Sequence, residues 1–368
     1  MYSQHFASID QTELRRMVEG VGEQDVRIAL EKEHLGIKDF AALITSSADP
    51  YLEQIANKAR QLTIQRFGRT ILMYAPLYVS NYCTNGCLYC GFNHDNQVDR
   101  LLLTPEQVMQ DAHIIASEGF RHLLLVSGED RRYADTPYLC QIARQLKGQF
   151  SSIGVEVQPL EEAEYAQLNT CGVDSLTIYQ ETYDRELYAH VHPKGRKHDF
   201  NYRIDTPDRG ARGGMRKVGL GVLLGLGNWA MDACNLALHV QYMMKTYWRT
   251  QVSVSFPRLR VAAGGFQPSD PVSDKHLFKL ICAFRLFTQD GVLVLSTRES
   301  AQFRDLVFPY GVTQMSAGSK TNPGGYTDHD ASEEQFHVED PRSAGEVARA
   351  IKEHGYEAVW KDWDVQLV

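Results

Sequence analysis

The chain has 368 residues, of which 43% are hydrophobic and 10% aromatic, so it has enough apolar material for a large core and is not a disordered chain. The formal net charge of −8 argues against a general electrostatic affinity for nucleic acid or for an anionic membrane surface. Seven cysteines are an odd number, and three of them fall within eight residues, so a secreted disulfide framework is a poor explanation.

Signals for export or membrane insertion do not stand out in the sequence. Residues 1–18 are polar throughout and have no apolar signal core. The longest apolar run, residues 218–231, is interrupted by glycine and is too short to span a bilayer. We therefore expect a soluble cytoplasmic protein.

Residues 1–69 are predicted to form a helical extension. This region is rich in charge, and apolar residues recur in it at roughly helical spacing. They are Leu14, Val18, Val21, Val26 and Leu30.

From Thr70 the pattern changes to short apolar runs, each followed by a longer amphipathic stretch, which is typical of parallel strands alternating with covering helices. Seven runs lie at 71–79, 122–126, 154–157, 175–179, 218–224, 251–256 and 291–295, and a weaker eighth lies at 311–315. Thr104, Thr136 and Ser273 mark helix starts. We predict an α/β fold in which residues 70–330 form a closed (βα)8 barrel of the TIM type, because open doubly wound sheets usually have fewer strands.

Residues 331–368 are predicted to close the structure. They contain a helical pattern at 345–354 that stops at Gly355, followed by an aromatic segment with Trp360 and Trp363. We expect this helix and tail to pack on the barrel.

A cysteine triplet directly follows the first predicted strand. Cys83, Cys87 and Cys90 have the spacing C-x3-C-x2-C, in a loop at the mouth of the barrel where such folds keep their chemistry. Three soft thiolates suit zinc or an iron-sulfur cluster and exclude hard cations. Since a cubane cluster normally uses four thiolates, three would leave one iron open to an external ligand. The other cysteines are expected to be small core residues. They are Cys140, Cys171, Cys234 and Cys282.

Two other interpretations of the triplet remain open at this point. One is a zinc site completed by His94, which would make the chain a zinc-stabilised binding protein, and the other is a redox dithiol. His190 and His192 are two residues apart like a metal pair in a strand, but without carboxylate support we interpret them as a polar loop pair.

With Tyr89 just before the last cysteine, the triplet resembles the signature of the radical S-adenosylmethionine (SAM) superfamily. The resemblance implies a [4Fe-4S] cluster on three cysteines whose open iron binds SAM, and reductive cleavage of SAM to methionine and a 5′-deoxyadenosyl radical. Ser127-Gly128-Glu129 resembles the segment that holds the SAM amino group, with Ser127 in place of a glycine. Glu181, in a stretch that ends the fourth strand, would contact the SAM ribose. Residues 199–206 resemble a biotin synthase pattern that nominates Arg203 for the SAM carboxylate.

Over nearly its whole length the chain resembles the 2-iminoacetate synthase family, the tyrosine lyases of bacterial thiazole biosynthesis. The matching stretches are 83–92, 179–183, 255–260, 296–299, 316–319, 323–326 and 359–364. The resemblance implies cleavage of the Cα–Cβ bond of L-tyrosine to p-cresol and 2-iminoacetate for the thiazole of thiamine. It also implies thiazole synthase as a protein partner and an external electron donor of the flavodoxin or ferredoxin type.

The same resemblance nominates Arg298 for the substrate carboxylate and Ser316 as its assistant. Alternatively, Arg298 forms an ion pair with Glu299, and Arg258 or Arg260 binds the substrate carboxylate in its place. The alternative for Ser316 is a loop serine that hydrogen-bonds a backbone group. The candidates for the aromatic pocket are Tyr78, Tyr82, Tyr179, Tyr183 and Tyr310.

Two relatives on this scaffold need to be distinguished. The hydrogenase maturase that also cleaves tyrosine continues into a C-terminal domain with a second cysteine cluster, whereas no cysteine follows Cys282 here. We therefore expect no such cluster. A tryptophan lyase differs in the pocket that faces the aromatic ring, and it stays open as an alternative.

Overall fold

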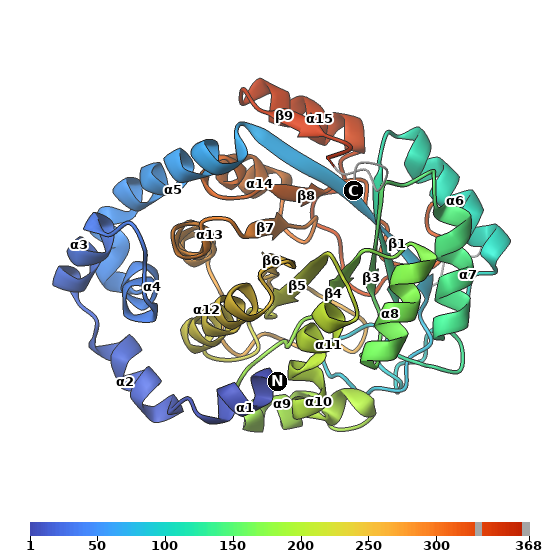
Figure 1. Ribbon diagram of the computed structural model, residues 1–368, viewed down its shortest axis with the longest axis horizontal. Helices are drawn as coiled ribbons and strands as arrows, with labels where there is room; N and C mark the ends of the chain where they lie inside the picture. The colour runs from blue at the N-terminus through green and yellow to red at the C-terminus, as the bar shows by residue number, and fades with distance from the viewer. Residues whose placement is uncertain (328–332, 363–368) are drawn as a thin grey trace.

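Eight parallel strands close into a barrel in the computed structural model, which describes residues 1–327 and 333–362 (Figure 1). The strands are β1 (Thr70–Ser80), β2 (His122–Ser127), β3 (Ser152–Glu156), β4 (Ser175–Thr177), β5 (Lys217–Gly221), β6 (Gln251–Ser255), β7 (Val292–Leu295) and β8 (Gln314–Ser316). The barrel closes because β1 pairs in parallel with both β2 and β8. Each strand overlaps one of the predicted apolar runs, so the predicted (βα)8 barrel is confirmed.

Helices cover the outside of this barrel, as Figure 1 shows. They are α6 (Pro105–Ser117), α7 (Thr136–Leu146), α8 (Glu162–Cys171), α9 (Arg185–Val191), α10 (Phe200–Ile204), α11 (Thr206–Arg212), α12 (Trp229–Thr246), α13 (Asp274–Thr288) and α14 (Ala301–Val307), with short 3-10 turns at Ser46–Tyr51, Arg196–His198 and Phe308–Tyr310. The hydroxyls of Thr104 and Ser273 cap α6 and α13 as the sequence predicts, whereas α7 is capped by Asp135 rather than by Thr136.

Five N-terminal helices arc around one side of the barrel (Figure 1). They are α1 (Tyr2–Ala7), α2 (Gln11–Gly20), α3 (Glu23–Glu31), α4 (Ile37–Ile44) and α5 (Leu52–Phe67). The Tyr2 ring is fully buried and stacks on His239 of α12 with ring centroids 3.6 Å apart. Because α4 and α5 pack on α13 and share its apolar core, this region and the barrel are held together by one hydrophobic core.

The C-terminal helix α15 (Ala344–Glu353) leads to β9 (Glu357–Val359), which pairs in parallel with the first residues of β1. Trp360 then packs edge-on against Phe120, with ring centroids 5.2 Å apart. Trp363 lies outside the described residues. The buried Val347 and Ile351 attach α15 to the common core.

Small and polar side chains line much of the barrel interior. They include Ser152, Gly154, Ser175, Thr177, Gly219 and Ser253, which surround a small cavity. In most TIM barrels large branched side chains fill this space. Tyr74, Tyr179 and Ser255 form both the upper wall of this cavity and part of the cavity at the barrel mouth.

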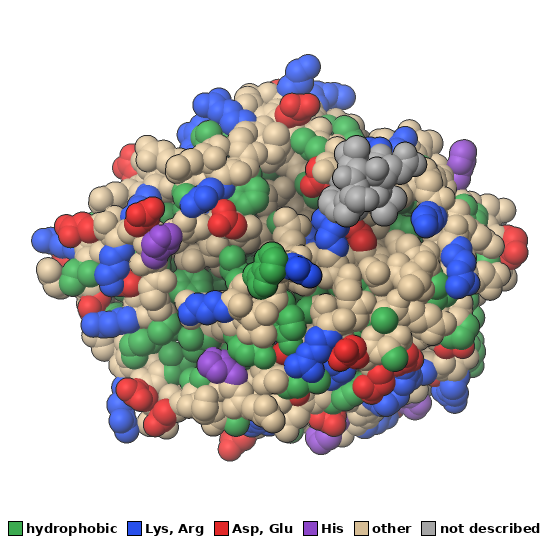
Figure 2. All heavy atoms as spheres, in the orientation of Figure 1, with side chains coloured by type: hydrophobic (Ala, Val, Ile, Leu, Met, Phe, Trp, Pro, Cys, Tyr) green, Lys and Arg blue, Asp and Glu red, His purple; other side chains and the backbone are tan. Residues whose placement is uncertain are grey.

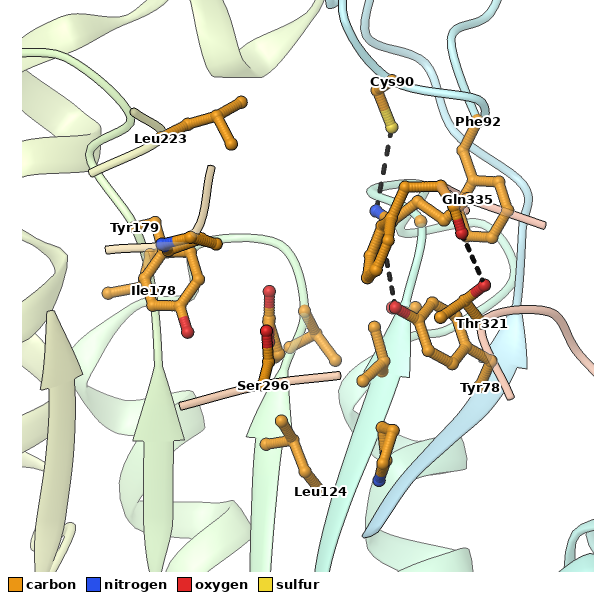
Figure 3. Close-up of a pocket in the computed structure, with 18 of the residues that line it drawn as sticks. Tyr78, Cys90, Phe92, Leu124, Ile178, Tyr179, Leu223, Ser296, Thr321 and Gln335 are labelled. Atoms are coloured by element: carbon orange, nitrogen blue, oxygen red, sulfur yellow. Dashed lines mark hydrogen bonds between the residues drawn. The ribbon is translucent and has the colours of Figure 1, made fainter. Parts of the chain in front are cut away.

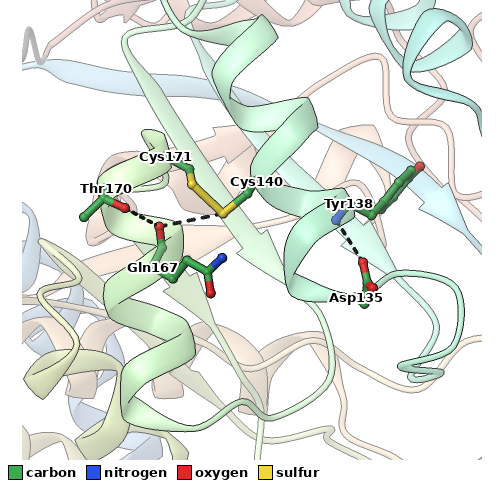
Figure 4. Close-up of a disulfide and its surroundings, with 6 residues drawn as sticks. All are labelled: Asp135, Tyr138, Cys140, Gln167, Thr170 and Cys171. Carbon is green, nitrogen blue, oxygen red and sulfur yellow. Dashed lines mark hydrogen bonds between the residues drawn. A yellow bond between two sulfur atoms is a disulfide. The ribbon is translucent and has the colours of Figure 1, made fainter.

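Two of the four cysteines predicted as separate core thiols form a disulfide (Figure 4). Cys140 of α7 and Cys171 of α8 are both about 1% exposed, as expected for core residues, but their Cα atoms are only 5.3 Å apart. The prediction of unpaired thiols was wrong because α7 and α8 pack side by side, which spacing along the sequence does not reveal. Cys234 and Cys282 are free and buried, as predicted.

Charged side chains of both signs are interspersed over the face shown in Figure 2. Among residues 1–327 and 333–362, no helix combines the length and the hydrophobicity needed to cross a membrane.

Candidate active site

The carboxyl ends of the barrel strands and the loops above them enclose a cavity of about 1260 Å³, counted out to its open mouth. All eleven residues that the sequence nominated for the cluster, SAM and substrate line this cavity. They are Cys83, Cys87, Tyr89, Cys90, Ser127, Gly128, Glu129, Glu181, Arg203, Arg298 and Ser316. Residues nominated from segments more than 200 positions apart therefore meet in one place.

The cysteine loop leaves the end of β1 and is held in shape by Arg100. The Arg100 guanidinium donates hydrogen bonds to the backbone oxygens of Asn81 at 2.7 Å, Phe92 at 3.0 Å and Asn93 at 2.7 Å. Asn81 in turn binds the returning chain, because its Oδ1 accepts from the Leu101 N–H at 2.6 Å. These contacts fix both ends of the segment that carries the three thiols.

The three thiols fit an iron-sulfur cluster. Cys87 is buried, and the half-buried Cys83 and Cys90 pack against an apolar patch that includes Tyr78. Burial raises the pKa of the Cys83 thiol to about 12, so a thiolate there needs a nearby positive centre, which metal coordination supplies. Within the described chain, no group of three His, Cys, Asp or Glu side chains is spaced to hold a single metal ion. His94, the candidate fourth zinc ligand, is exposed and lies 3.1 Å from the Asp95 carboxylate.

Gly128 brings the end of β2 against the cysteine loop. A Cβ atom at this position would lie 2.3 Å from the Tyr82 carbonyl oxygen, far inside contact distance, so only glycine fits. The Gly128 N–H donates to the backbone oxygen of Ser80 at 2.8 Å, and the Thr84 N–H donates to the backbone oxygen of Glu129 at 3.2 Å. This close approach carries the Glu129 side chain into the cavity beside the thiols.

Glu129 and Arg203 form a buried ion pair on the cavity wall. The Arg203 Nη1 lies 2.8 Å from Glu129 Oε1, and Asn85 Nδ2 donates to Glu129 Oε2 at 2.8 Å. Burial alone would raise the pKa of Glu129, but Arg203 and Lys197 together hold it below its ordinary value. Arg203 is oriented by a 2.7 Å hydrogen bond from its Nε to the Tyr179 oxygen. Its Nη2 makes no hydrogen bond to a described residue and faces Glu181 at 3.8 Å.

Lys197 is a cavity residue that the sequence did not indicate. Its Nζ lies 2.7 Å from Glu181 Oε1, with both side chains about 10% exposed. Glu181 has a φ of 72°, in the left-handed region that side chains other than glycine seldom adopt. Backbone strain of this kind clusters at functional sites, where it aims a side chain. Here it directs Glu181 toward Lys197 and Arg203.

The interpretation of His190 and His192 as a polar loop pair was wrong. His190 lies on α9 and is exposed, whereas His192 follows the end of the helix and is fully buried. His192 Nε2 lies 2.8 Å from the Tyr89 hydroxyl, and its Nδ1 lies 2.8 Å from the Tyr188 oxygen. Because α9 ends between the two histidines, they face different surroundings, and His192 supports the aromatic residue of the cysteine motif.

Arg298 also lines the cavity, and its guanidinium carbon lies 3.3 Å from the centre of the Phe336 ring. Glu299 pairs with Arg258 and, at 2.8 Å, with Arg260. These two arginines are therefore committed to Glu299, and Arg298 has no ion-pair partner among the described residues. Its charge remains available to the cavity.

Ser316 hydrogen-bonds a backbone group, as one of the two interpretations of the sequence predicts, and it also lines the cavity. Its Oγ accepts a hydrogen bond from the Thr297 N–H at 3.2 Å. The Tyr74 hydroxyl is a further hydrogen-bond partner of the Ser316 side chain. Burial raises the pKa of Tyr74 to about 12, and the hydrogen bond with Ser316 offsets this rise only in part. Ser316 is thus held in place from two sides.

Glu156 is a second cavity residue that the sequence did not indicate. It ends β3, and its carboxyl group makes no hydrogen bond or ion pair with another described residue. Burial, reinforced by Glu181, raises its pKa to about 7, although Arg298 acts in the opposite direction. A carboxyl group whose pKa lies near neutral pH, beside an arginine without an ion-pair partner among the described residues, has the properties of a ligand-binding pair.

Figure 3 shows one part of this cavity, with Tyr179 and Leu223 on one side and Tyr78, Gln335 and Cys90 on the other. Two of the five tyrosines nominated for the aromatic pocket, Tyr78 and Tyr179, line it. The others have different neighbours: Tyr82 stacks on Tyr133, Tyr183 hydrogen-bonds His239 and Tyr310 packs on Phe278.

Known proteins match this chain along its length. Residues 77–234 match the model of the Radical SAM superfamily, and residues 255–357 match the Biotin and Thiamin Synthesis associated domain. The chain is 44% identical over 367 residues to the 2-iminoacetate synthases of Salmonella typhimurium and Escherichia coli, which covers 100% of this chain and 97% of each relative. Its fold is similar to the crystal structure of HydG, a maturase of the [FeFe]-hydrogenase, with a TM-score of 0.90, 31% identity, and coverage of 96% of this chain and 80% of that one.

Proposed function

This chain belongs to the 2-iminoacetate synthase family of radical SAM enzymes, and we propose that it cleaves the Cα–Cβ bond of L-tyrosine to p-cresol and 2-iminoacetate for thiazole formation. The family and the lyase activity predicted from the sequence are confirmed by the full-length similarity. The observation that carries the assignment of this cavity as the active site is the convergence of all eleven nominated residues on it. Membership of this enzyme family argues against the alternative hypothesis that the chain is a zinc-stabilised binding protein.

A radical SAM enzyme uses a [4Fe-4S] cluster to cleave SAM reductively, and the resulting 5′-deoxyadenosyl radical abstracts hydrogen from the substrate. We propose Cys83, Cys87 and Cys90 as the three cluster ligands, with the fourth iron left for SAM. Glu129 and the backbone at Gly128 would bind the SAM amino group. The Nη2 of Arg203, which makes no hydrogen bond to a described residue and faces Glu181 at 3.8 Å, would meet the SAM carboxylate, and Glu181 would meet the ribose.

Tyrosine enters as a zwitterion, so its site must supply a cation and an anion close together. Arg298 supplies the cation for the carboxylate, assisted by Ser316. Glu156 supplies the anion for the ammonium group, since it lies close enough to Arg298 for the arginine to lower its pKa. Hydrogen abstraction from nitrogen requires the neutral amine, and a carboxylate at this position can accept the ammonium proton. The remaining task of the protein is positioning, because reacting atoms need separations of about 3 to 3.5 Å.

The enzyme needs an external reductant, for which we propose a flavodoxin or ferredoxin, and we propose thiazole synthase as the partner that consumes the unstable 2-iminoacetate. The cytoplasmic location predicted from the sequence stays a prediction.

Anaerobic reconstitution with iron and sulfide, followed by incubation with SAM, dithionite and either tyrosine or tryptophan, tests the activity. We expect p-cresol and 5′-deoxyadenosine from tyrosine, and neither product from a Cys90→Ala variant. Consumption of tryptophan without p-cresol formation from tyrosine would instead identify a tryptophan lyase.

A further inference from the structure

A segment from the C-terminal part of the chain, residues 333–340, crosses the cysteine loop at its last cysteine. The backbone N–H of Gln335 donates to the backbone oxygen of Thr321 at 2.9 Å. The backbone oxygen of Gln335 accepts from the Gly91 N–H at 3.1 Å. A Cβ atom at Gly91 would lie 2.8 Å from the backbone oxygens of Gln335 and Glu334, so the two backbones are in close contact. The position of Gln335 is therefore fixed relative to the cluster loop by its own backbone.

The Gln335 side chain bridges the cavity wall and a cysteine sulfur. Its Nε2 lies 3.7 Å from Cys90 Sγ, and its Oε1 accepts a hydrogen bond from the Tyr78 hydroxyl at 2.8 Å (Figure 3). The buried Tyr78 ring is itself held edge-on against Phe92, with centroids 5.9 Å apart. The amide is thus anchored at its oxygen end, and its nitrogen end is directed at the sulfur.

The chemistry of a thiolate supports this orientation of the amide. A thiolate accepts hydrogen bonds but cannot donate them, so an amide turned the other way would place two acceptors against each other. Among the three nominated ligands, only Cys90 receives a hydrogen bond from a side chain of the described residues.

We propose that Gln335 is a positioning residue that donates an N–H···S hydrogen bond to the Cys90 thiolate and thereby raises the reduction potential of the cluster. The proposal rests on the proposed function insofar as Cys90 is a cluster ligand. One-electron reduction takes the cluster from 2+ to 1+ with an electron from the external donor, and no bond to Gln335 forms or breaks. Reduction increases the negative charge on the sulfurs, so a donated N–H stabilises the reduced state more than the oxidised state.

The test is a redox titration of the reconstituted cluster, followed by electron paramagnetic resonance, without SAM or tyrosine. Gln335→Met keeps the length of the side chain and removes the donor, and Gln335→Glu replaces the donor with a carboxylate. We expect the reduction equilibrium constant to fall by roughly tenfold in Gln335→Met, which corresponds to about 59 mV for one electron. Gln335→Glu should lower it further.

Thr321→Val is the matched control, because Thr321 Oγ1 contacts the same segment through the Phe336 oxygen at 3.1 Å and makes no contact with a sulfur. Its potential should equal that of the unmodified enzyme. Tyr78→Phe removes the anchor but keeps the amide, and should give an intermediate potential.

Equal potentials in Gln335→Met, Gln335→Glu and the unmodified enzyme, at equal iron content, would overturn the proposal. So would an equal shift in Thr321→Val, which would attribute the effect to the segment rather than to the hydrogen bond. If the two Gln335 variants bind no iron while Thr321→Val does, Gln335 is needed for assembly and not for tuning, which also overturns it. Retention of the complete cluster by Cys90→Ala would refute the premise about Cys90, whereas an intact potential series in an enzyme that makes no p-cresol would refute only the proposed activity.

Discussion

Replacing Glu156 with glutamine should change how the stability of the protein depends on pH. The carboxyl group ends β3 at the cavity and has a pKa of about 7, against an ordinary value of 4.5, mainly because it is buried. At about 1.36 kcal/mol for each pKa unit, this difference corresponds to roughly 3 kcal/mol between the folded and the unfolded chain. The charged groups that act on it are Glu181, which raises the pKa, and Arg298, Lys197 and Arg203, which lower it.

The sign follows from which state holds the proton. Below pH 4.5 Glu156 is protonated in both states and contributes nothing to the pH dependence. Between pH 4.5 and 7 the unfolded chain releases the proton while the folded protein keeps it, so stability falls as pH rises. Above pH 7 the full cost, up to about 3 kcal/mol, is present, since the half-buried carboxylate is then ionised. Glutamine cannot ionise, so the variant escapes this cost.

Denaturant unfolding of the unmodified protein and of Glu156→Gln, both in the same cluster-loading state, should therefore diverge with pH. We expect the variant to gain up to about 3 kcal/mol relative to the unmodified protein between pH 4.5 and pH 8. Glu357→Gln, at an exposed position on β9, is the control and should show no such divergence. A difference between Glu156→Gln and the unmodified protein that stays constant with pH, or that shrinks as pH rises, would refute the raised pKa.

Three further substitutions test the cavity. Arg298→Lys should raise KM for tyrosine by about 10- to 100-fold in steady-state assays, because an ammonium cannot reproduce the two-pronged contact with a carboxylate, and an unchanged KM would remove Arg298 from the substrate site. Gly128→Ala should reduce the iron bound per chain after reconstitution, since its Cβ would lie 2.3 Å from the Tyr82 oxygen. Arg203→Met should lower the free energy of unfolding by about 3 to 5 kcal/mol at pH 7, because it leaves Glu129 buried without its partner, and a loss below 1 kcal/mol in denaturant titrations would contradict this.

The strand order and the position of the site could be predicted because a parallel barrel places all its strand ends on one face. Once the apolar runs are assigned, residues that follow them, such as Cys83, Glu129 and Arg298, must meet there. This rule needs no knowledge of side-chain packing. It therefore succeeded for residues that follow strands and carry recognisable motifs.

The residues that the sequence missed reach the cavity by other routes. Lys197 lies in the Arg196–His198 turn and Gln335 in the segment that crosses the cysteine loop, and neither follows a strand or belongs to a motif. Glu156 does end a strand, but its significance depends on its having no hydrogen-bond or ion-pair partner among the described residues, which only the packed structure shows. The Cys140–Cys171 disulfide was missed for the same reason, since it depends on the relative rotation of two helices.

The charges that line the cavity explain why a hydrogen bond at Cys90 should matter. Three cations, Arg203, Lys197 and Arg298, face three carboxyl groups, Glu129, Glu181 and Glu156, so the described wall is close to neutral when all of them ionise. A 2+ cluster on three thiolates would carry a charge of −1, and a SAM bound to its open iron through a neutral amine would add none, so the loaded site would carry about one negative charge. Reduction would add one more negative charge beside a wall whose described cations are already matched by carboxyl groups. The Gln335 side-chain N–H, which is directed at the Cys90 sulfur, is what this wall offers to stabilise that charge.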